Sequence, residues 1–249
     1  MKEKIYSSKP SIFQRYISLT NQKKILIEKI CKVINENYTS NKLSLLDIGC
    51  GDGTVTLQII SKLKDKYNLE INAIDVSKPL IECFKRKKSY TINYIIDNVE
   101  LIKILPKADF ILMSHILTYI NNLDDLIEKV LNALNLNGIA LIVLSNDFSD
   151  DVKVKNKLNK KLTTSHKVKK ILDKKNINYK VEIIESEIDI SGIENMDEDG
   201  RVIIEFFKHK SFEEISNDEI NDIREKILKI ANSSGKITKK EDYIWIKPI

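Results

Sequence analysis

The feature that most constrains this chain is a short apolar segment, residues 44–48, followed directly by three glycines at alternate positions, Gly49, Gly51 and Gly53. The next residues, 54–67, have the apolar spacing of a helix. Closely spaced glycines let a backbone adopt positive φ or be approached closely by another molecule. Between a strand and a helix, the amides of such a turn bind polar groups at the helix N-terminus. The sequence therefore predicts an α/β fold with a ligand-binding turn after its first strand.

The spacing of the glycines distinguishes this turn from a dinucleotide-binding turn. A dinucleotide fingerprint has the form G-x-G-x-x-G, whereas this turn reads G-x-G-x-G and follows an acid, Asp47. A second apolar segment, residues 70–74, ends in Asp75, where such folds place an acid that binds ribose hydroxyls. In this order of residues the chain resembles the Rossmann-like S-adenosylmethionine-dependent methyltransferases. The resemblance implies S-adenosyl-L-methionine as cofactor and S-adenosyl-L-homocysteine as product.

The resemblance also implies the fold class and the organisation of the chain. We expect an α/β, Rossmann-like, doubly wound sheet of seven strands, with the last strand antiparallel. The whole chain, 1–249, is expected to be a single methyltransferase domain. Its parts are a helical N-terminal lid, a cofactor-binding core, a helical insertion over the substrate cleft and the last strand, at residues 1–42, 43–185, 186–239 and 240–249.

Composition narrows the class of protein further. The chain is 42% apolar and 31% charged, which is typical of a globular protein. Its longest apolar stretches, such as residues 139–144, are far shorter than the roughly 20 residues that span a bilayer, and no signal-like segment follows Met1. Three cysteines without C-x-x-C spacing indicate neither a disulfide framework nor a zinc site. We therefore expect a cytoplasmic protein without a bound metal.

Four further residues are expected to contact the cofactor. Asp97 and Asn98 follow a predicted strand, at the place where this fold binds the adenine, although such a pair is also favourable turn chemistry. Val76 follows Asp75, and Ser114 ends the fourth predicted strand, residues 108–115. Ligands of open α/β sheets bind beyond the carboxyl ends of the strands, at the point where the strand order reverses. The predicted cofactor residues are Asp47, Gly49, Gly51, Gly53, Asp75, Val76, Asp97, Asn98 and Ser114.

Between residues 43 and 246 the chain is most similar to histamine N-methyltransferase and its relatives. The similarity rests on residues 56–62, 115–119, 164–165 and 187–191 and on Gly200. It implies that His115 lies beside the sulfonium and that Tyr119 lies on the substrate wall, so these two are the candidate catalytic residues. A histidine at a strand exit can equally serve as a structural hydrogen-bonding group.

The substrate-binding residues of that family do not carry over completely. Its acid in the N-terminal helix falls on Gln22 or Asn21 here, so histamine itself is not indicated as the substrate. A cationic substrate would have Glu241 or Asp242 as partners. The candidate substrate-binding residues are Tyr16, Gln22, Asn146, Asp147 and Phe206. For Tyr16 and Phe206, packing in the core is the alternative, because aromatic residues at helical spacing are commonly buried.

The function predicted from the sequence is methyl transfer to a small-molecule acceptor, an amine or other nitrogen, by a monomer. The first alternative is a nucleic-acid methyltransferase, because the formal net charge is +5 and residues 153–170 form a dense basic run. Against it, the lysines are interleaved with 36 acidic residues, and no Asn/Asp-Pro-Pro-aromatic run follows the fourth strand. The second alternative is a catalytically silent subunit that binds S-adenosylmethionine.

Overall fold

The computed structural model describes residues 10–87, 90–158 and 165–247. The described residues form a seven-stranded sheet with strand order β3-β2-β1-β4-β5-β7-β6, in which the last strand of the chain is antiparallel. This arrangement confirms the predicted fold class. The strands are β1 (Lys42–Ile48), β2 (Asn68–Asp75), β3 (Asn93–Ile96), β4 (Ala108–Ser114), β5 (Leu134–Ser145), β6 (Tyr179–Asp189) and β7 (Lys236–Ile246).

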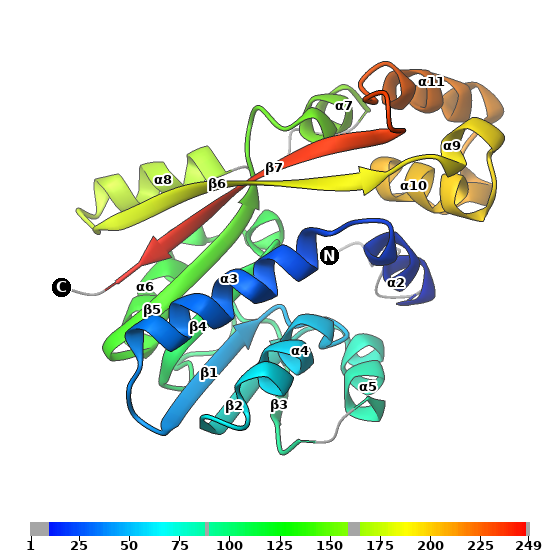
Figure 1. Cartoon of the computed structure of the whole chain (residues 1–249). Helices are drawn as coiled ribbons and strands as arrows, with labels where there is room; N and C mark the ends of the chain where they lie inside the picture. Colours follow the sequence, from blue (N-terminus) through cyan, green and yellow to red (C-terminus); the bar gives the residue numbers. More distant parts are fainter. Residues whose placement is uncertain (1–9, 88–89, 159–164, 248–249) are drawn as a thin grey trace. The chain divides into compact units, whose positions relative to one another are not determined.

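The parallel part of the sheet sets where a ligand can bind. β1 pairs in parallel with β2 on one side and with β4 on the other. β2 pairs in parallel with β3, and β4 with β5. The carboxyl ends of these strands therefore meet at one edge, and the strand order reverses between β1 and β4, which is where open α/β sheets bind ligands. Figure 1 shows β1 to β4 side by side, with α4 following β1.

Several helices begin at side-chain caps. Ser77 accepts a hydrogen bond from the Leu80 amide at the start of α5, and Asn122 accepts one from the Asp125 amide at the start of α6. The helices are α2 (Pro10–Ser18), α3 (Gln22–Asn37), α4 (Thr54–Leu63), α5 (Lys78–Arg86), α6 (Leu123–Ala133), α7 (Asp150–Leu158), α8 (Ser165–Lys174), α9 (Gly192–Asn195), α10 (Glu198–Lys208) and α11 (Asn217–Leu228).

The chain divides into two compact units, each with its own apolar core. The sheet unit comprises residues 26–144, 163–182 and 242–249, and the accessory unit comprises residues 1–25, 145–162 and 183–241. In the sheet unit, the buried faces of α6 and α8 pack on the central strands. In the accessory unit, α2, α7, α10 and α11 surround the second core. Within the described residues, no helix is long and apolar enough to cross a membrane.

This division differs from the predicted domain boundaries. The predicted lid ran to residue 42, but α3 belongs to the sheet unit from Leu26 onward. The reason is visible in its burial, because Leu26, Ile27, Ile30 and Ile34 of α3 are all fully buried. Residues 145–162, which were assigned to the core, belong instead to the accessory unit. Residues 1–9 of the predicted lid, and 159–164 of the basic run, lie outside the described residues.

Candidate cofactor and acceptor sites

The three glycines after β1 all adopt the left-handed backbone that favours glycine, but for different reasons. Their φ angles are 81° at Gly49, 56° at Gly51 and 72° at Gly53. A Cβ on Gly53 would lie 2.1 Å from a ring carbon of Phe84, and a Cβ on Gly49 would lie 2.9 Å from Cβ of Ile116. Gly49 and Gly53 are therefore required by close packing inside the sheet unit.

Gly51 is different, because a Cβ there would meet no atom within 4 Å. Packing of the protein does not require glycine at this position, although its positive φ favours one. Its amide donates a hydrogen bond of 2.9 Å to Oδ2 of Asp75, which joins the turn after β1 to the carboxyl end of β2. The turn and the acid that the sequence predicted to act together therefore lie in contact, and one face of the turn is open to a ligand.

Asp75 is held in place by backbone amides on both of its oxygens. Oδ1 accepts a hydrogen bond of 2.8 Å from the Ser77 amide, and Oδ2 accepts the one from Gly51. Burial raises the pKa of Asp75, and the backbone hydrogen bonds partly oppose this shift. Each carboxylate oxygen can accept two hydrogen bonds. Asp75 can therefore bind hydroxyl groups of a ligand while it keeps both backbone contacts.

Two other acids, one at the end of β1 and one in the turn, make contacts inside the protein. Asp47 is 3% exposed and its Oδ2 accepts a hydrogen bond from the Thr56 hydroxyl in the first turn of α4. Asp52, which the sequence reasoning did not select, binds the Thr54 amide at 3.2 Å and the Lys87 ammonium at 2.6 Å. Both acids therefore fix the start of α4 behind the turn. An acid two residues before a helix start is a capping signal that could have identified Asp52.

The residues predicted to bind the adenine lie at the end of β3. Asp97 is exposed, and its Oδ1 accepts a hydrogen bond of 2.7 Å from the Asn98 amide. Asn98 in turn accepts one of 3.1 Å from the Glu100 amide, so the pair forms the turn that its composition favours. Val76, at the end of β2, is 55% exposed. These three residues lie at the same sheet edge as Gly51 and Asp75 and are accessible to a ligand.

The exit of β4 carries the candidate catalytic residues. Ser114 ends the strand, and His115 follows it with a φ of 56°, an uncommon conformation for a residue other than glycine. The His115 amide donates to the Val143 carbonyl at 2.9 Å, which anchors this unusual backbone to β5. Tyr119 is 39% exposed at the end of the short helix that follows. Strained residues of this kind cluster at functional sites, which supports His115 as a candidate.

The residues predicted to bind the acceptor all lie in the accessory unit. Tyr16 of α2 is 1% exposed and stacks on Phe206 of α10, with ring centroids 3.4 Å apart. Gln22 is buried and donates a hydrogen bond of 2.7 Å to Glu241 Oε1. Asn146 is buried and accepts a hydrogen bond of 2.8 Å from the Phe148 amide, whereas Asp147 is exposed. Tyr16, Gln22 and Phe206 thus belong to a single unit, and both aromatic residues also contribute to its core.

The two acids proposed as partners for a cationic substrate already have cationic neighbours. Lys239 lies 3.4 Å from Glu241, and Lys169 lies 2.8 Å from Asp242. Ser165, the first residue of α8, donates its hydroxyl to Asp242 at 2.5 Å. Asp242 therefore does not offer the free carboxylate that a cationic substrate would need, because Lys169 balances its charge within the sheet unit.

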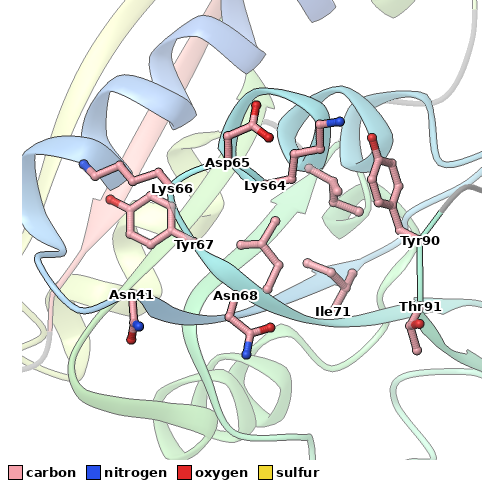
Figure 2. Close-up of a pocket in the computed structure, with 11 residues that line it drawn as sticks. Asn41, Lys64, Asp65, Lys66, Tyr67, Asn68, Ile71, Tyr90 and Thr91 are labelled. Carbon is pink, nitrogen blue, oxygen red and sulfur yellow. The ribbon is translucent and has the colours of Figure 1, made fainter.

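One hollow of the sheet unit lies away from these residues. It has a volume of about 630 Å³ and is lined at the amino ends of β1, β2 and β3, the opposite ends of the strands from Gly51 and Asp75. Figure 2 shows that the polar ends of Lys64, Lys66 and Asn68 point in different directions. Because its polar groups do not converge, this hollow has the features of an open surface depression.

The central part of the chain is similar to known methyltransferases. Residues 46–140 match the model of a methyltransferase domain family. The chain is 28% identical over 122 residues to a ubiquinone biosynthesis O-methyltransferase of Rickettsia typhi, covering 47% of this chain and 48% of that protein. It is 24% identical over 128 residues to a malonyl-[acyl-carrier protein] O-methyltransferase of Bacillus cereus, covering 51% and 46%. The chain spans about half the length of these curated relatives.

The fold is shared over a greater length. The structure of the plantazolicin methyltransferase BpumL with S-adenosylhomocysteine matches 98% of this chain and 88% of that chain, with a TM-score of 0.55 and 18% identity. The residues present here fit S-adenosylmethionine. The turn offers a backbone face without a side chain at Gly51, and Asp75 offers acceptor oxygens beside it.

Proposed function

We infer that the protein is an enzyme that transfers a methyl group from S-adenosylmethionine to a small molecule, which is supported by the match of residues 46–140 to a methyltransferase domain family. The observation that carries this conclusion is the contact between the Gly51 amide and the Asp75 carboxylate. It brings a backbone face free of side chains and a hydrogen-bond acceptor for the ribose to one point of the sheet edge.

The chain's own residues supply binding and positioning. The turn from Gly49 to Gly53 holds the methionine part of the cofactor, Asp75 its ribose and Asp97 its adenine. The sulfonium is an activated methyl donor, so the step needs the acceptor aligned with the methyl group and needs no covalent enzyme intermediate. Alignment of this kind can contribute about 7–11 kcal/mol to lowering a barrier. His115, at the exit of β4, accepts a proton from the acceptor or orients it, and Tyr119 lies on the acceptor's side.

The acceptor atom has two candidates, each supported by a separate observation. Nitrogen is the prediction made from the sequence, where residues 43–246 resemble histamine N-methyltransferases, but the relatives reported above do not include that family. Oxygen is supported by the curated relatives, because the two reported above are named as O-methyltransferases. Labelled S-adenosylmethionine offered to matched pairs of amines and phenols separates these candidates. Transfer to at least one small acceptor, reduced by replacement of His115, is the expected result.

A nucleic-acid acceptor is tested in the same assay. Enzymes that neutralise about six or more phosphates lose several orders of magnitude in affinity as salt rises from 50 to 200 mM. For a small acceptor we expect weak dependence on salt. Strong, salt-sensitive labelling of transfer or ribosomal RNA without labelling of small acceptors would contradict the proposal. Binding of S-adenosylhomocysteine without turnover on any acceptor would instead indicate a silent subunit.

A further inference from the structure

Glu100 lies in the turn after β3 and joins that turn to a later segment of the sheet unit. Its amide donates a hydrogen bond of 3.1 Å to Oδ1 of Asn98, so it belongs to the same turn as Asp97 and Asn98. Its carboxylate accepts hydrogen bonds from residues 21 and 22 positions further along the chain. One side chain therefore connects the turn assigned to the adenine with the segment that leads into α6.

The carboxylate of Glu100 uses both of its oxygens on this segment. Oε1 accepts hydrogen bonds from the backbone amides of Asn121 at 3.0 Å and Asn122 at 2.9 Å. Oε2 accepts one of 3.0 Å from the side-chain amide of Asn121. Hydrogen bonds to an ionised carboxylate are stronger than those between neutral groups, and a helix N-terminus also favours a negative charge. Glu100 therefore holds the residues at the start of α6 in place.

α6 also holds the turn after β3 at a second point. Lys129 of α6 donates a hydrogen bond of 2.9 Å to the backbone carbonyl of Glu100 and pairs with Asp125 of its own helix at 2.8 Å. Val99, the neighbour of Glu100 in the turn, is 5% exposed and packs in the core of the sheet unit. The turn after β3 and the start of α6 are therefore connected to one another and anchored in the core.

The segment 115–122, between β4 and α6, carries both candidate catalytic residues. Near its beginning, the side chain of Ile116 occupies the space that a Cβ on Gly49 would need. In its middle, Leu117 is fully buried in the core. At its end, the backbone amides of residues 121 and 122 bind Glu100. Both ends of this segment thus contact parts of the protein that the proposed function assigns to the cofactor.

Tyr119 is the residue of this segment whose position depends most on Glu100. Its amide donates a hydrogen bond of 2.9 Å to the Ile116 carbonyl, which is a bond within the segment itself. Tyr119 is 39% exposed, so burial fixes it less than it fixes Leu117. Because Asn121 follows only two residues later, the hydrogen bonds of Glu100 limit where Tyr119 can lie.

We propose that Glu100 is a positioning residue that ties the adenine turn to the segment 115–122, so that cofactor binding orders Tyr119 for the acceptor. The inference rests on the proposed function, which places the adenine beside Asp97 and Tyr119 on the acceptor's side. Glu100 itself touches neither molecule in this arrangement. It transmits occupancy of the cofactor site to the acceptor side, which is a coupling between two sites.

Hydrogen–deuterium exchange of the full chain, with and without S-adenosylhomocysteine, measures this coupling without an acceptor. In the wild type we expect the ligand to slow exchange of residues 118–122 at least about fivefold, the low end of coupling between two sites. In Glu100→Ala this slowing should be lost, while exchange of the turn 49–53 still slows. Glu100→Gln keeps an oxygen that can accept from both backbone amides, so it should retain the slowing.

A matched control removes another acid that links α6 to a neighbouring element. Glu128 is an exposed residue of α6 that pairs with Lys175, just beyond the end of α8. This pair joins α6 to a part of the sheet unit that the proposed function does not assign to the cofactor. Glu128→Ala should therefore show the same slowing of residues 118–122 as the wild type.

The affinity for S-adenosylhomocysteine gives a second measurement, because coupling between two sites is mutual. If the ligand slows exchange of residues 118–122 about fivefold through Glu100, removing the contact should weaken ligand binding by up to that factor. We therefore expect calorimetry to show about two- to fivefold weaker binding to Glu100→Ala. An unchanged affinity would mean that Glu100 only stabilises the start of α6, and would overturn the proposal.

Two exchange results would also overturn it. One is equal slowing of residues 118–122 in the wild type and in Glu100→Ala, and the other is no slowing there in a wild type that binds the ligand. If Glu100→Ala did not fold, Glu100→Asp would replace it, since this side chain keeps the charge but is one methylene too short, and should also lose the slowing. Failure of the wild type to bind S-adenosylhomocysteine would refute the proposed function instead.

Discussion

Replacing Gly51 and Gly53 by alanine, one at a time, should separate the cofactor-binding role of the turn from its packing role. Both residues have positive φ, so an added Cβ costs about 1–2 kcal/mol at either position. At Gly53 the methyl group would also lie 2.1–2.3 Å from three ring carbons of Phe84. Overpacking of this kind adds about 1–3 kcal/mol. At Gly51 the methyl group meets no atom within 4 Å, so nothing is added.

We therefore expect the two substitutions to rank in opposite order for loss of stability and for loss of cofactor affinity. Gly53→Ala should lower the free energy of unfolding by about 2–5 kcal/mol, and Gly51→Ala by about 1–2 kcal/mol. For cofactor affinity the order reverses, because the Gly51 methyl group occupies the face to which the cofactor binds. We expect Gly51→Ala to weaken binding of S-adenosylhomocysteine at least tenfold. Urea denaturation gives the stabilities, and calorimetry on the folded proteins gives the affinities.

If Gly51→Ala bound S-adenosylhomocysteine as tightly as the wild type, the cofactor would not bind against this face of the turn. A Gly53→Ala protein as stable as Gly51→Ala would refute the packing part, because the ring of Phe84 would have to move at no cost. Gly51→Val, with a β-branched side chain, should abolish binding completely.

Three further predictions address the charged groups of the two units. Asp75→Ala should weaken S-adenosylmethionine binding about 10- to 150-fold, because hydrogen bonds to a charged group have this scale. If calorimetry showed an unchanged affinity, Asp75 would not belong to the cofactor site. His115→Asn, which tolerates the left-handed backbone, should lower kcat about a hundredfold with unchanged S-adenosylhomocysteine affinity; an unchanged kcat would leave His115 a structural role. Because burial lowers the pKa of Lys155 to about 8 from 10.5, the unfolded chain binds more protons between these values. The free energy of unfolding of the wild type, relative to that of Lys155→Met, should therefore rise by about 2–3 kcal/mol from pH 8 to 10.5. If this difference did not change with pH, Lys155 would not be buried as a charge.

Most of the sheet and one face of the cofactor site could be predicted because they depend on local patterns. The apolar run before Gly49 and the one before Asp75 identify two strands, and the parallel order of the fold brings their ends together. Contact between the Gly51 amide and Asp75 follows from that order. By contrast, nothing local in the sequence indicates that Asp47 binds Thr56 inside the protein, since an acid before a turn can face either way.

Two strands begin before the segments that mark them in the sequence. β5 begins at Leu134, five residues before the apolar stretch at 139–144, and Asn137 takes a φ of 66° within the strand. β7 begins at Lys236, four residues before the segment 240–249 that was predicted as the last strand, because its inward-facing positions carry charge. Lys239 and Glu241 are buried there, so the alternation of apolar residues that marks a strand is absent.

The contact of Lys155 with an aromatic ring of the accessory unit could not be predicted at all. Tyr16, Lys155 and Phe206 come from three segments far apart in the sequence, and each has an ordinary local reason to be where it is. Tyr16 and Phe206 have helical apolar spacing, and Lys155 lies in a run of lysines that indicates an exposed face. Only the fold shows that Lys155 is buried against the ring of Phe206.

A crystal structure of the protein with S-adenosylhomocysteine would show directly whether the cofactor binds at this turn. We predict that the methionine part lies against the backbone of Gly49 and Gly51 and that the ribose hydroxyls lie within hydrogen-bonding distance, about 2.6–3.2 Å, of the Asp75 carboxylate. The adenine should lie at the end of β3, beside Asp97. Density for the ligand at another place on the sheet, or a ribose without contact to Asp75, would contradict the account.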